Sequence, residues 1–446
     1  MTHSRLLVAC CAVLTAACGR SDLLLGPPVA GTGGSGAEGG GGAGGDPMGG
    51  GGMGGTPQDC SVLQVQGPVG VAGGVMAHQR QPTMTVLEDE RVVLAMEWTD
   101  AGVPMAPREL RHTAFSPWGP GFLPGDAAPS FLADLDRGWS FAVTPSIDGR
   151  FGLLMQGPPG GPGSSLVFNP YFFPGDGQIG PDGVVGFAAR VLFASHDGFG
   201  RFLLGFELQM NVVDSLVVAA LAEILDDGSV FVTQGAGVIA CGSGRLVADA
   251  VYTGAEWLVS TSTGDPSGFF QCQMGPPPPN GTFLQTLVVD EFGGAVTLAV
   301  SEPLAPIDSL RVVPKPQGYV VLTSSVGDAF GVPVEAWPLT SSGVPAGGLT
   351  PLAGLGASVV PGSWGAGTFG DGFLVAAVDA ASGTLAAQRY GGGLQPLGAA
   401  NLGLDGAPVG PAAVVGEPGG LSAVVAQSAT DVVGDQIRLF GLRCPP

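Results

Sequence analysis

The chain is poor in positive charge. It has a single lysine, Lys315, and only 16 basic residues against 37 acidic ones in a length of 446. The resulting net charge of −21 at pH 7 excludes nucleic acid and anionic headgroup layers as partners held by electrostatic attraction. We therefore expect no nucleic-acid partner.

Local signatures of catalysis and of metal binding are also missing. The sequence contains no H-E-x-x-H, Walker loop, G-x-S-x-G or S-x-x-K, and the histidines beyond residue 60 (His78, His112 and His196) are widely separated. Ser195-His196-Asp197 cannot form a triad by itself, because adjacent side chains in a strand point to opposite faces. We interpret it as a turn, and we expect no catalytic residue, no cofactor and no metal.

The first apolar run is too short to span a bilayer. It covers 12 residues, Leu6 to Ala17, whereas a transmembrane helix needs about 20. Arg5 is the only charge before it, and small residues end it in Leu14-Thr-Ala-Ala-Cys18. Residues 1–17 are therefore interpreted as a cleaved signal peptide.

This order of features resembles the amino terminus of bacterial lipoproteins. The resemblance implies that the Cys18 thiol receives diacylglycerol, that cleavage occurs just before it, and that the new amino group is acylated, with palmitate as a typical chain. The bilayer is then a partner through Cys18. Thr15 stands where the family usually has leucine, and an ordinary secretory signal cleaved near Ala17 is the alternative. The residue after the cysteine is Gly19 and not aspartate. By resemblance to lipoprotein sorting, this implies a location at the outer membrane or cell surface.

A low-complexity tract follows Cys18. Glycine supplies 16 of the 25 residues from Gly31 to Gly55, a composition that cannot bury enough apolar surface to offset its backbone entropy. Residues 18–59 are therefore predicted to be the lipidated cysteine and a disordered Gly-rich linker, spanning roughly 35 Å on average. Such tethers resemble those of surface lipoproteins of the myxobacteria.

The remaining chain, 60–446, carries a repeat of about 50 residues. Seven segments follow one pattern, in which a single flanking residue precedes a short apolar run. They are Arg91-Val-Val-Leu-Ala, Arg150-Phe-Gly-Leu-Leu, Arg201-Phe-Leu-Leu-Gly, Glu256-Trp-Leu-Val-Ser, Gly318-Tyr-Val-Val-Leu, Gly372-Phe-Leu-Val-Ala and Gly420-Leu-Ser-Ala-Val. Further strand-like pieces precede and follow each segment, such as Gly268 to Met274 after Glu256-Trp-Leu-Val-Ser. Helix-period segments are scarce. The pattern predicts an all-β β-propeller of seven blades, with tandem β-sandwiches as the alternative.

Four cysteines remain in the predicted mature domain: Cys60, Cys241, Cys272 and Cys444. An even number in an exported chain indicates disulfides, with three possible pairings. If Ser61 to Gln66 forms the outer strand of the last blade, antiparallel to Asp435 to Leu442, then Cys60 lies beside Cys444. We therefore expect Cys60–Cys444 and, around the fourth blade, Cys241–Cys272.

Two functions are consistent with these features. The first is a membrane-anchored surface lipoprotein that acts as a binding or interaction module for a glycan, cell-wall or protein ligand. Trp118 and Trp364, in Pro/Gly-rich loops, are candidates for lining such a site, whereas Trp257 is expected in the core. The alternative is an extracytoplasmic propeller-type hydrolase or lyase whose site is assembled from several blades.

Overall fold

The computed structural model describes residues 60–445 apart from 61, 72–76, 104–105, 119–128, 136–139, 146–149, 157–164, 173–176, 179–182, 188–189, 210–213, 226–229, 233–236, 265–280, 328–330, 356–357 and 432–433. The chain divides into two units, Met1–Asp59 and Cys60–Pro446. Cys18 and Cys272 lie outside the described residues.

Within the described residues the secondary structure is all β, arranged in seven antiparallel sheets. Sheet 1 consists of β2 (Ala77–Val86), β3 (Val92–Asp100), β4 (Arg108–Phe115) and β5 (Ser130–Leu135). Sheet 2 consists of β6 (Phe141–Pro145), β7 (Arg150–Gln156), β8 (Ser165–Phe172), β10 (Gly183–Phe187) and the short β9 (Gly177–Gln178). Sheet 3 consists of β11 (Arg190–His196), β12 (Arg201–Gln209), β13 (Asp214–Ile224), β14 (Val230–Val232) and β15 (Gly237–Ser243).

Sheets 4 to 7 follow the same order along the chain. Sheet 4 consists of β16 (Ala248–Tyr252), β17 (Trp257–Thr263), β18 (Phe283–Val289) and β19 (Ala295–Val300). Sheet 5 consists of β20 (Ile307–Lys315), β21 (Gly318–Ser325), β22 (Glu335–Leu339) and β23 (Thr350–Pro351). Sheet 6 consists of β24 (Gly365–Phe369), β25 (Gly372–Val378), β26 (Leu385–Gly391) and β27 (Pro396–Asn401). Sheet 7 consists of β28 (Ala407–Gly416), β29 (Ser422–Asp431), β30 (Gly434–Arg443) and, from the start of the domain, β1 (Gln64–Gly70).

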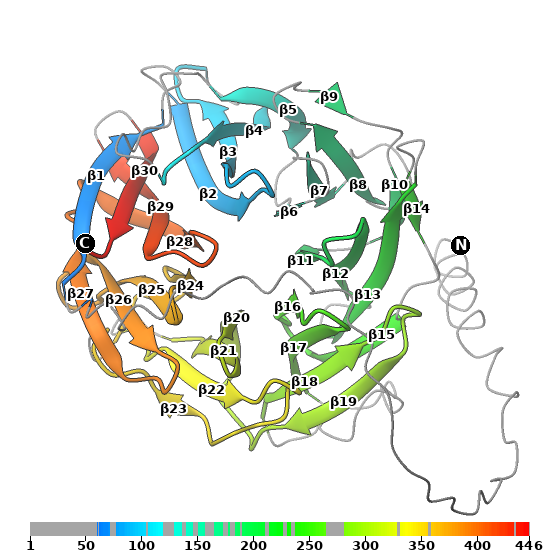
Figure 1. The fold of residues 1–446 in the computed structure, drawn as a ribbon. Helices are drawn as coiled ribbons and strands as arrows, with labels where there is room; N and C mark the ends of the chain where they lie inside the picture. Colours follow the sequence, from blue (N-terminus) through cyan, green and yellow to red (C-terminus); the bar gives the residue numbers. More distant parts are fainter. Residues whose placement is uncertain are drawn as a thin grey trace, which may run out of the picture. The chain divides into compact units, whose positions relative to one another are not determined.

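The sheets follow one another around a ring (Figure 1). The first strand of each sheet contacts the first strand of the next, in the order β2, β6, β11, β16, β20, β24, β28 and back to β2. This is the arrangement of a β-propeller. The alternative of tandem β-sandwiches is wrong, because the first and last sheets pack on each other and every sheet has two neighbours.

The seven predicted apolar segments mark the second strand of each sheet. They begin or immediately precede β3, β7, β12, β17, β21, β25 and β29. In β3, Val93 and Ala95 pack in a cluster shared with sheet 2, whereas Leu94 and Met96 pack in a cluster shared with sheet 7. Because both faces of the second strand are covered, its apolar residues run continuously instead of alternating with polar ones.

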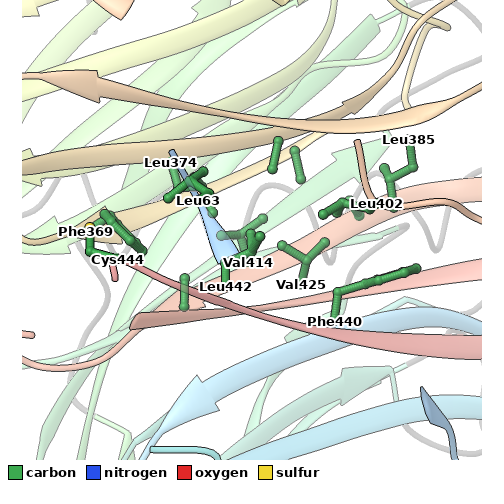
Figure 2. Packing of buried hydrophobic residues seen from close by; sticks show 14 of the residues in the cluster. Leu63, Phe369, Leu374, Leu385, Leu402, Val414, Val425, Phe440, Leu442 and Cys444 are labelled. Atoms are coloured by element: carbon green, nitrogen blue, oxygen red, sulfur yellow. The ribbon is translucent and has the colours of Figure 1, made fainter. Parts of the chain in front are cut away.

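The core consists of layers between neighbouring sheets. The described buried residues form seven apolar clusters, each bridging two sheets that are adjacent in the ring. Figure 2 shows the cluster between sheets 6 and 7, where Leu374 of β25 lies near Leu442 of β30. Trp257 is fully buried in the cluster between sheets 3 and 4, which confirms its predicted core position.

One strand assignment from the sequence needs correction. Gly268–Met274 was expected as the third strand of the sheet that contains Trp257, but that segment lies outside the described residues. The third strand is β18, whose residues Phe283–Val289 pair with Trp257–Thr263 of β17. The connection from β17 to β18 is longer than in the other sheets, so a fixed repeat spacing placed the strand too early.

The alternation of strand directions gives the ring two distinct ends. Connections from first to second and from third to fourth strands lie at one end, which we call the turn end. Connections from second to third strands, and the passages from one sheet to the next, lie at the other, which we call the crossing end. This assignment follows from the antiparallel pairing within every sheet.

Sheet 7 closes the ring by joining the two ends of the domain. β1 pairs antiparallel with β30, from Gln64 opposite Arg443 to Gly70 opposite Arg438, which confirms that the segment after Cys60 is the outer strand of the last sheet. Cys60 and Cys444 form a disulfide with a Cα–Cα distance of 5.3 Å across a sequence separation of 384. Both cysteines are buried in the cluster of Figure 2, at the turn end.

Removing this disulfide tests how far ring closure stabilises the fold. In the chain-entropy model a bridge that closes so long a loop stabilises the native state by about 6 kcal/mol. The double variant Cys60→Ala/Cys444→Ala is therefore expected to unfold at markedly lower urea concentration. Val62→Ser, which changes an exposed neighbour at the same end, serves as the control. A midpoint equal to that of the native chain would contradict the closure argument.

Candidate functional site

The predicted site residues are cysteines, and the structure places three of the five. Cys60 pairs with Cys444 as expected. Cys241, on β15, is disulfide-bonded, but its expected partner Cys272 lies outside the described residues, so that pairing stays a prediction. Cys18 also lies outside them, and its lipidation stays a prediction as well.

A polar cluster at the crossing end joins the first sheet to the last. It comprises His78 and Arg80 of β2, Thr430 of β29 and Asp435 of β30, and we call it the clasp. Arg80 Nε and Thr430 Oγ1 both donate to the Asp435 carboxylate. His78 Nδ1 lies 3.2 Å from Asp435 Oδ2 and 3.2 Å from the Asp435 backbone nitrogen. Residues more than 340 positions apart in the chain therefore share one carboxylate.

The environment of Asp435 favours its charged form. Its side chain is only 4% exposed, and burial alone would raise the pKa. Hydrogen bonds from Thr430 and Arg80, with the charges of Arg80 and His78, outweigh burial and hold the pKa of Asp435 below its ordinary value of 3.8. The carboxylate is thus ionised at neutral pH and acts as the anchor of the clasp.

His78 and Arg80 of the clasp remain partly accessible. The side chains of His78 and Arg80 are 35% and 46% exposed. Their backbone is held in place by Gln79, which is buried, accepts a bond from Ile437 N at 3.1 Å and donates to Val71 O at 3.3 Å. The clasp therefore presents positioned N–H donors to solvent at the crossing end.

Two further buried carboxylates lie toward the same end. Arg108 donates to both oxygens of Glu97, at 2.8 Å from Nε to Oε1. In sheet 3, Glu207 lies 3.1 Å from Arg190 Nε and accepts the Leu246 N–H at 3.0 Å. Glu97 and Glu207 each stand six residues after an arginine that opens a repeat segment. This shared repeat position was the sequence signal that would have identified both ion pairs.

The tryptophans suggested for a ligand site take different places. Trp364 is buried, and its Nε1 donates to Ser324 Oγ at 2.8 Å, so its candidacy as a lining residue is wrong. Trp118 is partly exposed and packs beside the cluster between sheets 7 and 1. Its Nε1 donates to the carbonyl of Glu90, which lies in the connection from β2 to β3 at the turn end.

Ser195-His196-Asp197 lies at the hairpin between β11 and β12, as predicted. The Asp197 carboxylate accepts Phe199 N at 2.7 Å and Arg201 N at 3.0 Å. Gly198 N and Gly200 N each lie 3.2 Å from a ring nitrogen of His196. Burial lowers the pKa of His196 from 6.5 to about 4, and the charge of Asp197 opposes this only in part. These three residues therefore shape a turn.

Among the residues that the structure describes, no group of three or more His, Cys, Asp or Glu side chains is arranged to hold a metal ion. The same residues include no helix long and apolar enough to cross a membrane.

Comparisons with known proteins bear on the fold only. No protein family matches the sequence, and no curated protein matches it. A protein of unknown function from Dyadobacter fermentans is similar in structure, with 10% identity and a TM-score of 0.45 over 86% of this chain and 99% of that one. The β-propeller domain of the trilobed protease from Pyrococcus furiosus is 8% identical to this chain, with a TM-score of 0.47 over 83% of this chain and 98% of that one. An α-L-arabinanase from Penicillium chrysogenum is 13% identical to this chain, with a TM-score of 0.41 over 85% of this chain and 99% of that one.

The buried His196 predicts a specific pH dependence of stability. Between pH 6.5 and 4 the unfolded chain binds a proton at this residue that the folded chain does not, so the folded state loses about 3 kcal/mol as the pH falls through this window. His196→Asn keeps a hydrogen-bond acceptor and does not titrate. Its stability relative to the native chain should therefore rise on acidification, measured by urea unfolding at pH 7 and at pH 4. Parallel pH curves would contradict the prediction.

Proposed function

We propose that the chain is an exported, lipid-anchored surface protein that acts as a binding module, each of its seven sheets forming one blade of the propeller. Cys18 anchors it, the Gly-rich linker carries it, and the crossing end binds a glycan, cell-wall or protein ligand. The observation that carries the exported location is the Cys60–Cys444 disulfide, accompanied by the disulfide-bonded Cys241. Disulfides form and persist in oxidising compartments outside the cytoplasm.

The geometry of the crossing end supports binding over hydrolysis. Two of the buried carboxylates that the structure describes there are already engaged, Asp435 by Arg80 and Thr430 and Glu97 by Arg108. A general acid or base needs a carboxylate free to exchange a proton with a substrate, whereas these groups hold cations and strands in place. The exposed edges of His78 and Arg80 offer fixed donors to hydroxyl or carboxylate oxygens of a ligand.

Lipidation is tested by metabolic labelling. Cells that express the full chain should incorporate labelled palmitate into it, and Cys18→Ser should abolish that incorporation and release the protein from the membrane fraction. Cys10→Ser, within the same predicted signal peptide, is the matched control and should leave labelling intact. Unchanged labelling of Cys18→Ser would overturn the anchor.

Binding at the crossing end is tested on intact cells. A photo-crosslinking residue in place of Val103, which is exposed in the connection from β3 to β4, is expected to capture a discrete glycan or protein. Arg80→Gln in the same background removes clasp donors and should reduce capture about tenfold. Arg91→Gln, an arginine at the turn end, is the control. Capture that is insensitive to Arg80→Gln would exclude the clasp as the binding site.

A further inference from the structure

Two phenylalanines protrude from the turn end. Phe199, between β11 and β12, is 78% exposed, and Phe292, between β18 and β19, is 84% exposed. Single exposed apolar side chains are ordinary on soluble proteins. These two are unusual because they sit on turns of the same construction in neighbouring sheets.

Each turn is held by an aspartate two residues before the phenylalanine. Asp197 Oδ1 accepts Phe199 N at 2.7 Å and Arg201 N at 3.0 Å. Asp290 Oδ1 accepts Phe292 N at 2.9 Å and Gly294 N at 2.7 Å. The sequences share the order Asp-x-Phe-Gly. The side chains are therefore presented on fixed backbones, and little conformational entropy remains to be lost on burial.

An ion pair joins the two turns. Arg201 Nη1 lies 2.6 Å from Glu291 Oε2, while Arg201 Nε donates to Asp197 at 2.7 Å. Three other exposed apolar side chains lie at the turn end of sheets 3, 4 and 5. Together with the phenylalanines they form what we call the apolar rim: Phe199, Leu225, Phe292, Val296 and Val344.

The domain begins at the same end of the ring. Cys60 is joined to Cys444, which follows the last residue of β30, and this is a third-strand terminus at the turn end. Sheet 7 lies across the ring from sheets 3 and 4 (Figure 1). The described domain, which follows a predicted linker of about 41 residues, therefore begins at the turn end of sheet 7, across the ring from the sheets that carry most of the apolar rim.

We propose that the apolar rim inserts into the interface of a zwitterionic phospholipid bilayer, so that the propeller rests on the membrane with its turn end down. This inference rests on the proposed lipid anchor. A flexible tether of this length keeps the membrane at an effective concentration on the order of millimolar, so a weak apolar contact is sufficient. The net charge of −21 disfavours anionic lipid, whereas Arg201 offsets one of the two negative charges of Asp197 and Glu291 beside the rim.

The arrangement has a functional consequence for the crossing end. With the rim and the linker both on the membrane side, the clasp faces away from the bilayer. The proposed ligand site is then open to the surroundings, and it does not depend on how far the linker extends.

Depth-dependent quenching tests the proposal in the full lipidated chain. Phe199→Trp and Phe292→Trp place a reporter at the rim, and Val103→Trp and Val326→Trp place one at exposed positions of the crossing end. Each protein is reconstituted into phosphatidylcholine vesicles with brominated acyl chains. The rim reporters should lose about half of their added fluorescence and the crossing-end reporters almost none. Four described native tryptophans, Trp98, Trp257, Trp337 and Trp364, are buried, so brominated chains do not reach them, and the emission of the native chain in the same vesicles is subtracted.

The outcomes separate this inference from the anchor itself. Flotation of the vesicles first shows whether the chain is membrane-bound, and failure at that step overturns the proposed lipid anchor. If the chain floats but rim and crossing-end reporters are quenched equally, or neither is quenched, the membrane-facing rim is wrong. Rim reporters that are unquenched by lipid but shielded from acrylamide on intact cells would assign the rim to a protein or glycan partner instead.

Discussion

The fold depends on the pairing of β1 with β30. Every other sheet is built from strands that follow one another in the chain, but sheet 7 takes its outer strand from the start of the domain. Without that pairing β30 would be an open edge, and the cluster between sheets 6 and 7 would lose Leu63 and Cys60. The disulfide holds this strand in register at the point where the domain also begins.

Hydrogen bonds between first strands maintain the interior of the ring. Ser140 Oγ accepts Val191 N at 2.7 Å, and Asp249 Oδ2 accepts Val312 N at 2.8 Å. Burial raises the pKa of Asp249, although Arg311 and two backbone amides oppose this shift. In each case a side chain of one sheet satisfies a backbone donor of the next, as buried polar groups require. The ring is therefore connected by specific bonds as well as by apolar layers, which makes its two ends rigid platforms.

The sequence predicted the features that recur in every sheet. It did not predict the contacts that form where the first sheet meets the last. The second strands were identifiable because coverage on both faces leaves a continuous apolar run, as in Arg201-Phe-Leu-Leu. Outer strands such as β27 are short and mostly exposed, and its residues PLGAAN contain no run of large apolar side chains, so they carry a weak signal. The shared position of Glu97 and Glu207 was readable in the repeat. The meeting of His78 with Asp435 was not, because no local pattern records a contact across 357 positions.

The origin of β1 affects the order in which the sheets assemble during synthesis. β1 precedes every other described strand in the chain, and its partner β30 is the last of them. Sheets 1 to 6 contain only local pairings and can assemble progressively, but the final sheet requires the longest loop closure in the domain. Until then β1 is a strand without neighbours, open to pairing with other chains. The late step of folding is thus a meeting of the two ends of the domain, and a truncation that removes β30 would lose the whole ring closure and not merely one strand.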